Sequence, residues 1–264
     1  MVLNDIIEYK RKEIEELKRR FPLAKITQAA EKLVEPKRSL HKSLSTKRRF
    51  HLICELKKAS PSEGILREHF EPTTLAQEFE AAGASAISVL TERHYFKGNP
   101  ETLKQIRPLT TIPLLRKDFI LDSYQIYEAT LLGADAFLLI AMLLTDSELK
   151  QLLKLGRSLG LEALVEVHTK EELDRAIGAE SQIVGINNRN LKTLEIDRSV
   201  SENLIRFIPK GTVAVIESGI ETRQEIVRYE SLGVRCFLIG TTLMKSKNIK
   251  DTILELTGQS NGVL

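Results

Sequence analysis

The chain has 264 residues, of which 42% are hydrophobic and 28% are charged, and its formal net charge at pH 7 is +3. This composition is ordinary for a globular protein with a sizeable core, and it argues against a disordered chain and a strongly basic nucleic-acid-binding domain. The first twenty residues are too charged for a signal peptide, and no apolar run reaches the roughly 18 residues of a membrane span. We therefore expect a cytoplasmic protein that binds neither membranes nor nucleic acid.

The N-terminal fifty residues are predicted to be helical and to lie outside the main fold. Apolar side chains recur at helical spacing in residues 2–20, which predicts an amphipathic surface helix. These residues are Leu3, Ile6, Ile7, Ile14 and Leu17. After residue 20 the pattern weakens, and ITQAAEKLV and SLHKSL are expected to form short helices. We interpret the basic run at 47–49 as a solvated linker, with nucleic-acid binding a distant alternative, because no aromatic residues are interleaved.

From residue 51 onward, apolar runs alternate with amphipathic helical segments. The runs are 51–57, 85–92, 112–119, 136–143, 162–168, 183–188, 213–218 and 236–242. Near-continuous hydrophobic strands between helices are typical of a parallel sheet that helices cover. Eight such units in about 200 residues favour a closed (β/α)8 TIM barrel over an open doubly wound sheet. No GxGxxG motif follows the first strand, which also argues against a dinucleotide-binding fold.

The predicted organisation is one α/β domain over residues 1–264. Residues 1–50 form the N-terminal helical extension and residues 51–264 form the barrel. Within the barrel, Asp146 and Thr169 are predicted helix N-caps. The two cysteines, Cys54 and Cys236, lie in separate apolar runs without a CxxC motif or a Cys/His cluster, so we expect buried free thiols and no metal site.

Charged residues end the odd-numbered strands. Glu55 and Lys57 end the first strand, and both point to the same side because side chains alternate along a strand. Lys117, Glu166 and Glu217 end the third, fifth and seventh strands. Function collects at the C-terminal ends of barrel strands, so we predict that these five residues share one pocket. Such crowding shifts pKa values and supplies an acid and a base near neutral pH; the alternative is a salt-bridged rim that only closes the barrel mouth.

The even-numbered strands and one histidine provide weaker signals. The second strand ends in Thr91 and Glu92, and the fourth offers mainly Met142, which we expect to line an apolar wall. His168 lies beside Glu166 on the same face of the fifth strand. Without partner ligands or a nucleophile nearby in the sequence, it is expected to be a hydrogen-bonded structural residue.

Small residues after the last two strands indicate an anion site. Ser218 and Gly219 follow the seventh strand, and Gly240 and Thr241 follow the eighth. Small residues allow backbone N–H groups to approach a phosphate, and many barrels bind phosphate at this place. Ser62 in the first loop could close over the same anion. The alternative is that the glycines only permit tight turns.

Two aromatic residues follow the second and third strands. Phe96 and Phe119 could pack against a planar substrate ring. Ordinary core packing is the alternative for each of them.

At this point the motifs resemble those of a known family. ELKKASPSEG, LLRKDFI, LVEVH, GINNRNL, IESGI and LIGTTLM, in this order, look like the indole-3-glycerol-phosphate synthases of tryptophan biosynthesis. The resemblance covers the whole chain, including the N-terminal extension. It implies a carbon–carbon lyase (carboxy-lyase) that closes a ring on 1-(2-carboxyphenylamino)-1-deoxy-D-ribulose 5-phosphate and yields indole-3-glycerol phosphate, CO2 and water. It also implies that no cofactor or metal is needed. We expect a monomer, with a homodimer as the alternative.

The resemblance also implies catalytic roles. Lys117 matches the general acid at the substrate ketone, and such an acid works best with its pKa lowered toward neutrality. Lys57, Glu55 and Glu166 match the residues that act as second acid and base, with the division among them open. Asn187 and Glu217, also catalytic positions, match residues that hydrogen-bond the substrate hydroxyls and hold Lys117.

The substrate-binding positions follow in the same way. Arg189 matches a cation near the anthranilate carboxylate, and the two phenylalanines match the ring pocket. The full set is Ser60, Phe96, Phe119, Arg189, Ser218, Gly219, Gly240 and Thr241.

The chain departs from the family pattern in three places. Thr241 stands where serine is usual. Arg116 stands where an apolar residue is common, and it is expected to face the helices or the rim because it alternates with Lys117. The first eight residues contain no aromatic side chain that could close the pocket.

Two other barrel functions remain open at this point. One is a phosphoribosylanthranilate isomerase, which would use a Cys/Asp pair; Cys54 alternates with Glu55 and is expected to face away from the pocket. The other is a barrel that binds a sugar phosphate without catalysis.

Overall fold

Eight parallel strands form a closed barrel in the computed structural model, which describes residues 2–33 and 36–258. The strands are β1 (His51–Leu56), β4 (Ala86–Leu90), β5 (Leu114–Lys117), β6 (Ala136–Ile140), β7 (Glu162–Val167), β8 (Ile183–Asn187), β9 (Val213–Glu217) and β10 (Cys236–Ile239). Their order around the barrel is β1-β10-β9-β8-β7-β6-β5-β4. The predicted TIM barrel is confirmed, and each predicted run contains one of these strands.

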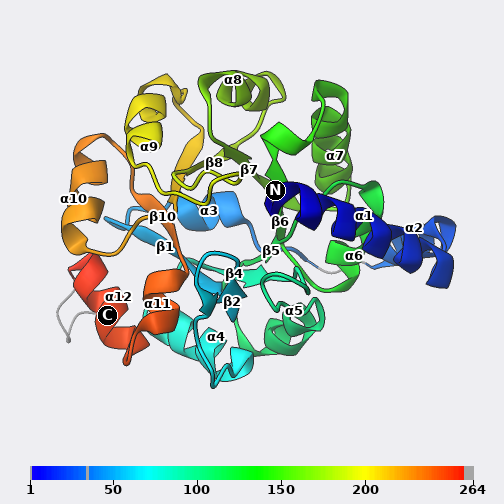
Figure 1. Ribbon diagram of the computed structural model, residues 1–264, viewed down its shortest axis with the longest axis horizontal. Coiled ribbons are helices and arrows are strands. Elements are labelled where there is room, and N and C mark those ends of the chain that lie inside the picture. Colours follow the sequence, from blue (N-terminus) through cyan, green and yellow to red (C-terminus); the bar gives the residue numbers. More distant parts are fainter. Residues whose placement is uncertain (1, 34–35, 259–264) are drawn as a thin grey trace.

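Helices surround the ring of strands (Figure 1). They are α4 (Pro72–Ala81), α5 (Glu101–Ile106), α6 (Ser123–Leu131), α7 (Asp146–Ser158), α8 (Lys170–Gly178), α9 (Ser199–Leu204), α10 (Arg223–Ser231), α11 (Thr241–Lys245) and α12 (Ile249–Thr257). Short 3₁₀ turns η1 (Arg107–Leu109), η2 (Ala141–Leu143) and η3 (Ile205–Phe207) extend three of the connections. No helix in the described ranges is both long and apolar enough to cross a membrane.

Side-chain caps determine where two of the helices begin. The Thr169 hydroxyl accepts the Glu172 backbone N–H and caps α8, as predicted. The predicted cap at Asp146 is wrong, because Thr145 caps α7 instead. The Thr145 hydroxyl accepts the Glu148 N–H, and the Glu148 carboxylate accepts the Thr145 N–H at 2.7 Å. This reciprocal capping box satisfies two free N–H groups, so Asp146 becomes the first helical residue.

Strand alternation separates two hydrophobic layers. Inside the barrel, side chains such as Ile53, Leu115 and Leu164 pack against one another. Cys54 points the other way and packs between the strands and the outer helices. Both cysteines are buried free thiols, as predicted. Because Glu55 is two residues after Ile53, the inward row of apolar side chains continues into charged ones at the C-terminal end of the barrel.

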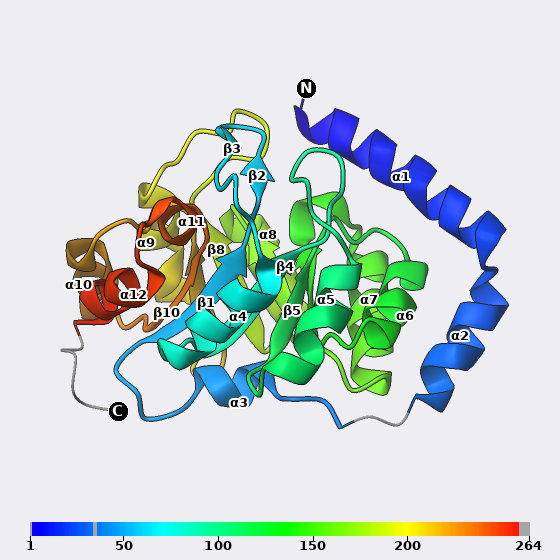
Figure 2. The ribbon, with the colours of Figure 1, turned by 90° about the horizontal axis from the view of Figure 1, so that it is seen from below.

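The N-terminal extension reaches both ends of the barrel. It consists of α1 (Val2–Arg20), α2 (Leu23–Lys32) and α3 (Leu40–Leu44), in agreement with the predicted helices. The first turns of α1 lie at the same end as the hairpin after β1, whereas α3 lies at the opposite end (Figure 2). Leu40 and Leu44 of α3 pack into the inner core and close that opposite end.

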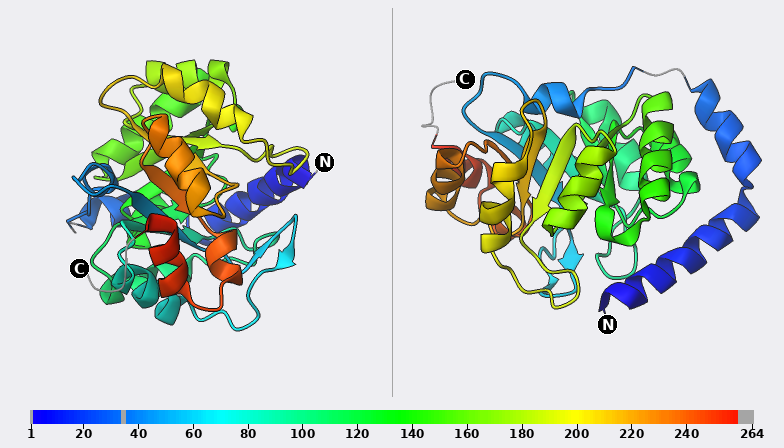
Figure 3. Two further views of the ribbon diagram at one scale, coloured as in Figure 1. Left: turned by 90° about the vertical axis from the view of Figure 1, so that its left-hand side faces the viewer. Right: turned by 90° about the horizontal axis from the view of Figure 1, so that it is seen from above.

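The connection after β1, predicted from the sequence to be a loop, contains a small antiparallel hairpin. It joins β2 (Ala59–Ser60) to β3 (Gly64–Ile65), and Ser60 pairs with Gly64. Gly64 has φ of 68°, a left-handed conformation that glycine adopts without strain. The hairpin and the N-terminal end of α1 lie on the same side of the barrel in both views of Figure 3.

Candidate active site

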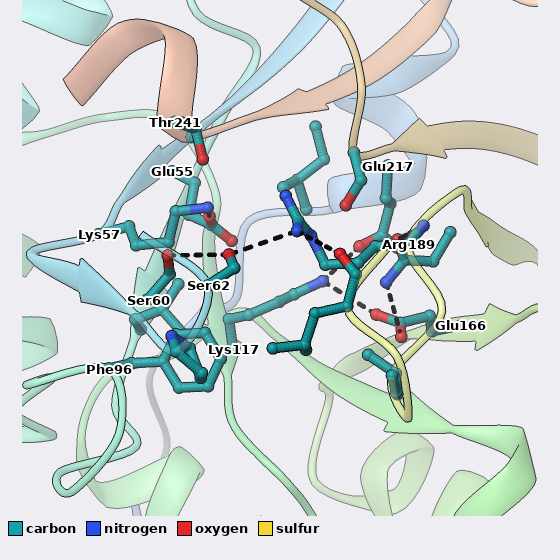
Figure 4. Close-up of a pocket in the computed structure, with 18 of the residues that line it drawn as sticks. Glu55, Lys57, Ser60, Ser62, Phe96, Lys117, Glu166, Arg189, Glu217 and Thr241 are labelled. Carbon is teal, nitrogen blue, oxygen red and sulfur yellow. Dashed lines mark hydrogen bonds and ion pairs between the residues drawn. The ribbon is translucent and has the colours of Figure 1, made fainter. Parts of the chain in front are cut away.

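A pocket opens at the C-terminal ends of the strands (Figure 4). Every catalytic and substrate-binding residue predicted from the sequence lines it. The predicted catalytic residues there are Glu55, Lys57, Lys117, Glu166, Asn187 and Glu217. The predicted binding residues there are Ser60, Phe96, Phe119, Arg189, Ser218, Gly219, Gly240 and Thr241. The barrel thus brings together residues that lie almost 190 positions apart, from residue 55 to residue 241.

Lys117 lies at the centre of the charged part of the pocket. Its Nζ donates to Glu166 Oε2 at 3.1 Å and also forms an ion pair with Glu217. Asn187 Nδ2 donates to the other Glu166 oxygen, Oε1, at 3.0 Å. These residues lie at or next to the C-terminal ends of β5, β7, β8 and β9, so the barrel itself aligns one ammonium between two carboxylates (Figure 4).

Glu55 and Lys57 form a second ion pair from β1 and the residue after it. Lys57 Nζ lies 3.1 Å from Glu55 Oε2, and both side chains are largely buried. The same-side prediction for these two residues is confirmed. A Cβ atom at Gly240 would overlap the Glu55 carboxylate. Glycine at 240 therefore provides the space for Glu55 in addition to any role in holding an anion.

The pKa of Lys117 differs from the expectation. Burial by itself lowers this pKa, but the carboxylates of Glu217, Glu166 and Glu55 outweigh burial and raise it. The sequence led us to expect a lowered pKa for Lys117. It could not show how close the three carboxylates would lie to the ammonium. With its pKa raised, Lys117 is protonated at neutral pH and presents an ammonium group to the pocket.

The two carboxylates that contact Lys117 have pKa values shifted in opposite directions. Burial raises the pKa of Glu217 to about 7; Lys117 opposes this shift and the neighbouring Glu166 adds to it. Burial acts on Glu166 in the same direction, but Lys117, His168 and Asn187 outweigh it and lower the pKa of Glu166. Neighbouring groups with diverging pKa values are the usual arrangement for an acid and a base in one site.

The turn after β9 forms one side of the predicted anion end. Ser218 has φ of 64° and Gly219 has φ of 79°, so both adopt the left-handed conformation. A Cβ atom at Gly219 would also lie 2.8 Å from the Ile196 side chain. The turn itself thus requires Gly219. Across the pocket, Ser60 and Ser62 of the hairpin place their hydroxyl oxygens 3.4 Å apart.

The opposite end of the pocket is apolar. The rings of Phe96 and Phe119 lie with centroids 6.2 Å apart and planes at 42°. The buried Glu92 carboxylate holds the Phe96 loop by accepting the backbone N–H groups of residues 94–96. Thr91 donates to Asp118 at 2.7 Å. Thr91 and Glu92 therefore support the loops and do not line the pocket.

Sequence reasoning missed the contribution of α1. Leu3 and Ile6, which are three residues apart on one helix face, line the pocket beside the two phenylalanines. The apolar spacing in α1 was visible in the sequence, but nothing in it indicated where the helix would dock. The first eight residues contain no aromatic side chain, and they contribute aliphatic side chains to the pocket instead.

Met142 is a second difference, because it does not line the pocket. It lies in the turn η2 after β6, where the strand alternation has ended. Leu138 and Ile140 of β6 form the apolar wall instead.

The two arginines lie on different sides of the barrel wall. Arg189 lines the pocket, and its guanidinium donates to Leu194 O at 2.7 Å and to Ser62 Oγ at 3.3 Å. Arg116 was predicted to face either the helices or the rim, and it faces the helices. Its guanidinium pairs with Glu128 at 2.6 Å. In the part of the chain that the structure describes, no group of three or more His, Cys, Asp or Glu residues could hold a metal ion.

Comparisons with known proteins agree with this geometry. A family model described as "Indole-3-glycerol phosphate synthase" matches residues 3–256. A protein of that name from Campylobacter hominis is 49% identical over 209 residues, which cover 79% of this chain and 80% of the relative. Another of the same name, from Thermoanaerobacter pseudethanolicus, is 42% identical over 266 residues and covers 99% of each chain.

Solved structures with similar folds are more distant in sequence. 3-Hexulose-6-phosphate synthase from Salmonella typhimurium superposes with a TM-score of 0.64 at 11% identity, over 79% of this chain and 97% of that one. KGPDC from Streptococcus mutans superposes with a TM-score of 0.63 at 14% identity, over 80% of this chain and 97% of that one. At these identities the likeness concerns the barrel fold alone. The family match over nearly the whole chain is the decisive finding, and this chain belongs to the indole-3-glycerol phosphate synthase family.

Proposed function

We propose that this pocket carries out the synthase reaction with Lys117 as the general acid. The family reaction closes a ring on 1-(2-carboxyphenylamino)-1-deoxy-D-ribulose 5-phosphate and releases CO2 and water. The observation that carries the assignment is the position of the Lys117 ammonium between Glu166 and Glu217 in the pocket. Attack of an aromatic carbon on the ketone leaves negative charge on the ketone oxygen, and a protonated, fixed lysine can neutralise it.

The two ends of the pocket suit the two ends of this substrate. Phe96 and Phe119 offer an apolar surface to the aromatic ring. The turns at Ser218–Gly219 and Gly240–Thr241 form the phosphate end, and Arg189 is a fixed cation for the carboxylate that leaves as CO2.

The later dehydration needs a second acid and a base. Glu166 has a lowered pKa and is ionised at neutral pH, so we assign it the role of base. Lys57, held by Glu55 at 3.1 Å, is the ammonium that can protonate the departing hydroxyl. Asn187 and Glu217 hold Glu166 and Lys117 and are placed to hydrogen-bond the substrate hydroxyls.

We further propose that the enzyme acts as a monomeric single domain in the cytoplasm. The N-terminal helix α1 packs over the pocket of its own chain and contributes Leu3 and Ile6 to the lining. Light scattering coupled to size exclusion tests the monomer. A homodimer peak would contradict it.

The function is tested by following indole fluorescence during turnover of the carboxyphenylamino substrate. The chain contains no Trp, so its own emission does not mask the product. Product formation without added metal supports the proposal. Binding without turnover would instead favour a barrel that only holds a sugar phosphate.

A parallel assay with phosphoribosylanthranilate tests the isomerase alternative. That reaction would need the cysteine of a Cys/Asp acid–base pair in the pocket, but Cys54 packs behind the barrel wall and burial raises the pKa of its thiol. We expect no conversion. Efficient isomerisation would overturn the synthase assignment.

A further inference from the structure

His168 contacts Glu166 but is not among the residues that line the substrate pocket. It follows β7 two residues after Glu166, and its imidazole lies between two carboxylates. Nε2 is 3.4 Å from Glu166 Oε1, and Nδ1 is 3.3 Å from Glu172 Oε2. The side chain is only 13% exposed and is not among the residues that line the pocket. His168 can therefore act on the reaction only through Glu166.

Glu172 orients the imidazole. Its carboxylate accepts the backbone N–H of His168 at 2.7 Å as well as contacting Nδ1. The Glu172 backbone N–H is in turn held by the Thr169 cap of α8 at 3.2 Å. This arrangement leaves Nε2 buried and aimed at Glu166, without a well-formed hydrogen bond to any described residue.

We propose that His168, oriented by Glu172, is a positioning residue whose protonated imidazole holds the Glu166 carboxylate in place and thereby sets the alkaline limit of the pH range in which Glu166 works as a base. The inference rests on the proposed function, since Glu166 is the base there. Because Glu172 accepts from Nδ1, a neutral His168 keeps its proton on Nδ1 and presents the Nε2 lone pair to Glu166. A protonated His168 presents an N–H instead. Loss of that proton thus replaces an attraction to the Glu166 carboxylate by a repulsion.

The charges around His168 keep it protonated to higher pH. The titratable groups that face it are Glu172 from α8, Glu166 from β7 and Glu217 from β9, and Lys117 lies beyond Glu166. Burial lowers the pKa of His168, but the hydrogen bond to Glu172 and the three carboxylates outweigh burial and raise it. Activity is therefore expected to fall on the alkaline side as His168 loses its proton.

Glu172→Gln is the sharpest test. Glutamine keeps an oxygen acceptor for Nδ1 but removes the negative charge, so the alkaline limb of the kcat profile should move by roughly one pH unit toward lower pH. KM should stay within about twofold because Glu172 is not among the residues that line the pocket. The pKa of His168, followed by NMR of its ring proton, should fall by the same amount in the ligand-free protein.

His168→Gln provides the second variant. It places a neutral amide near Glu166, so the alkaline limb should disappear while kcat at the optimum falls by no more than about tenfold. His41→Gln, on α3 at the opposite end of the barrel, is the matched control and should keep the wild-type profile. If wild type turns over and the alkaline limb of the kcat–pH profile is unchanged in both Glu172→Gln and His168→Gln, the inference about His168 is wrong. The synthase assignment would then remain intact. An inactive wild type would instead contradict the proposed function, and the NMR titration would still decide on the charge coupling.

Discussion

The carboxylate of Glu217 occupies the space that a Cβ atom at Gly185 would take. The two residues lie on neighbouring strands β8 and β9, and Gly185 pairs with Val215 in the sheet. The absence of a side chain at residue 185 thus allows Glu217 to lie against Lys117. Glycine at residue 185 thus provides the space that the Glu217–Lys117 ion pair needs.

Gly185→Ala is expected to lower kcat by about tenfold or more, because the added methyl group pushes Glu217 away from Lys117. Steady-state kinetics at pH 7 provides the measurement. Gly178→Ala is the matched control: nothing lies within 4 Å of a Cβ atom there, so activity should not change. Equal activity of the two variants would contradict the spatial argument.

Glu217 should make stability depend on pH. Its pKa is raised to about 7 in the folded state, against roughly 4.3 when unfolded. Between these values the folded state binds more protons than the unfolded state, so unfolding free energy falls as pH rises from about 4.5 to 7. Glu217→Gln removes this loss, and its unfolding free energy relative to wild type should therefore increase from pH 5 to pH 8.

Urea denaturation at the two pH values measures the difference. Glu31→Gln, at an exposed carboxyl of α2, is the control and should follow wild type at both values. A relative stability of Glu217→Gln that stays flat or falls between pH 5 and pH 8 would contradict the assigned pKa.

The docking of α1 depends on a buried ion pair. Lys10 is 2% exposed, and its Nζ lies 2.8 Å from Asp118 Oδ1, one residue from Lys117. Lys10→Met leaves Asp118 without this partner and should destabilise the fold by about 3 kcal/mol. Lys12→Met removes only an exposed pair with Glu8 and should leave the stability nearly unchanged.

Chemical denaturation of the two lysine variants checks this expectation. The Lys10 variant should also raise KM, since Leu3 and Ile6 on the same helix line the pocket. Equal stability of the two variants would show that Lys10 does not hold the helix.

The barrel and the charged cluster were predictable because both follow from short-range periodicity. Apolar runs defined each strand, and alternation placed Glu55 and Lys57 on one side. The general rule for barrels then brought Lys117, Glu166 and Glu217 to the same end. No residue-to-residue distance was needed for these steps.

The remaining features depend on contacts between segments that are distant in sequence. The docking of Leu3 and Ile6 beside the phenylalanines could not be read from the α1 pattern. The raised pKa of Lys117 depends on its distances to carboxylates on other strands. The error at Asp146 was local: Thr145 and Glu148 form a stronger cap than the aspartate alone.

The most direct test of the general-acid assignment is a single-turnover measurement on Lys117→Met, with substrate affinity measured separately. The account predicts that the variant still binds the substrate, while ring closure slows by about 10²-fold or more. Lys57→Met, measured in parallel, should slow only the later dehydration, so that the ring-closed intermediate accumulates. Ring closure at the wild-type rate in Lys117→Met would contradict the assignment and transfer the acid role to Lys57.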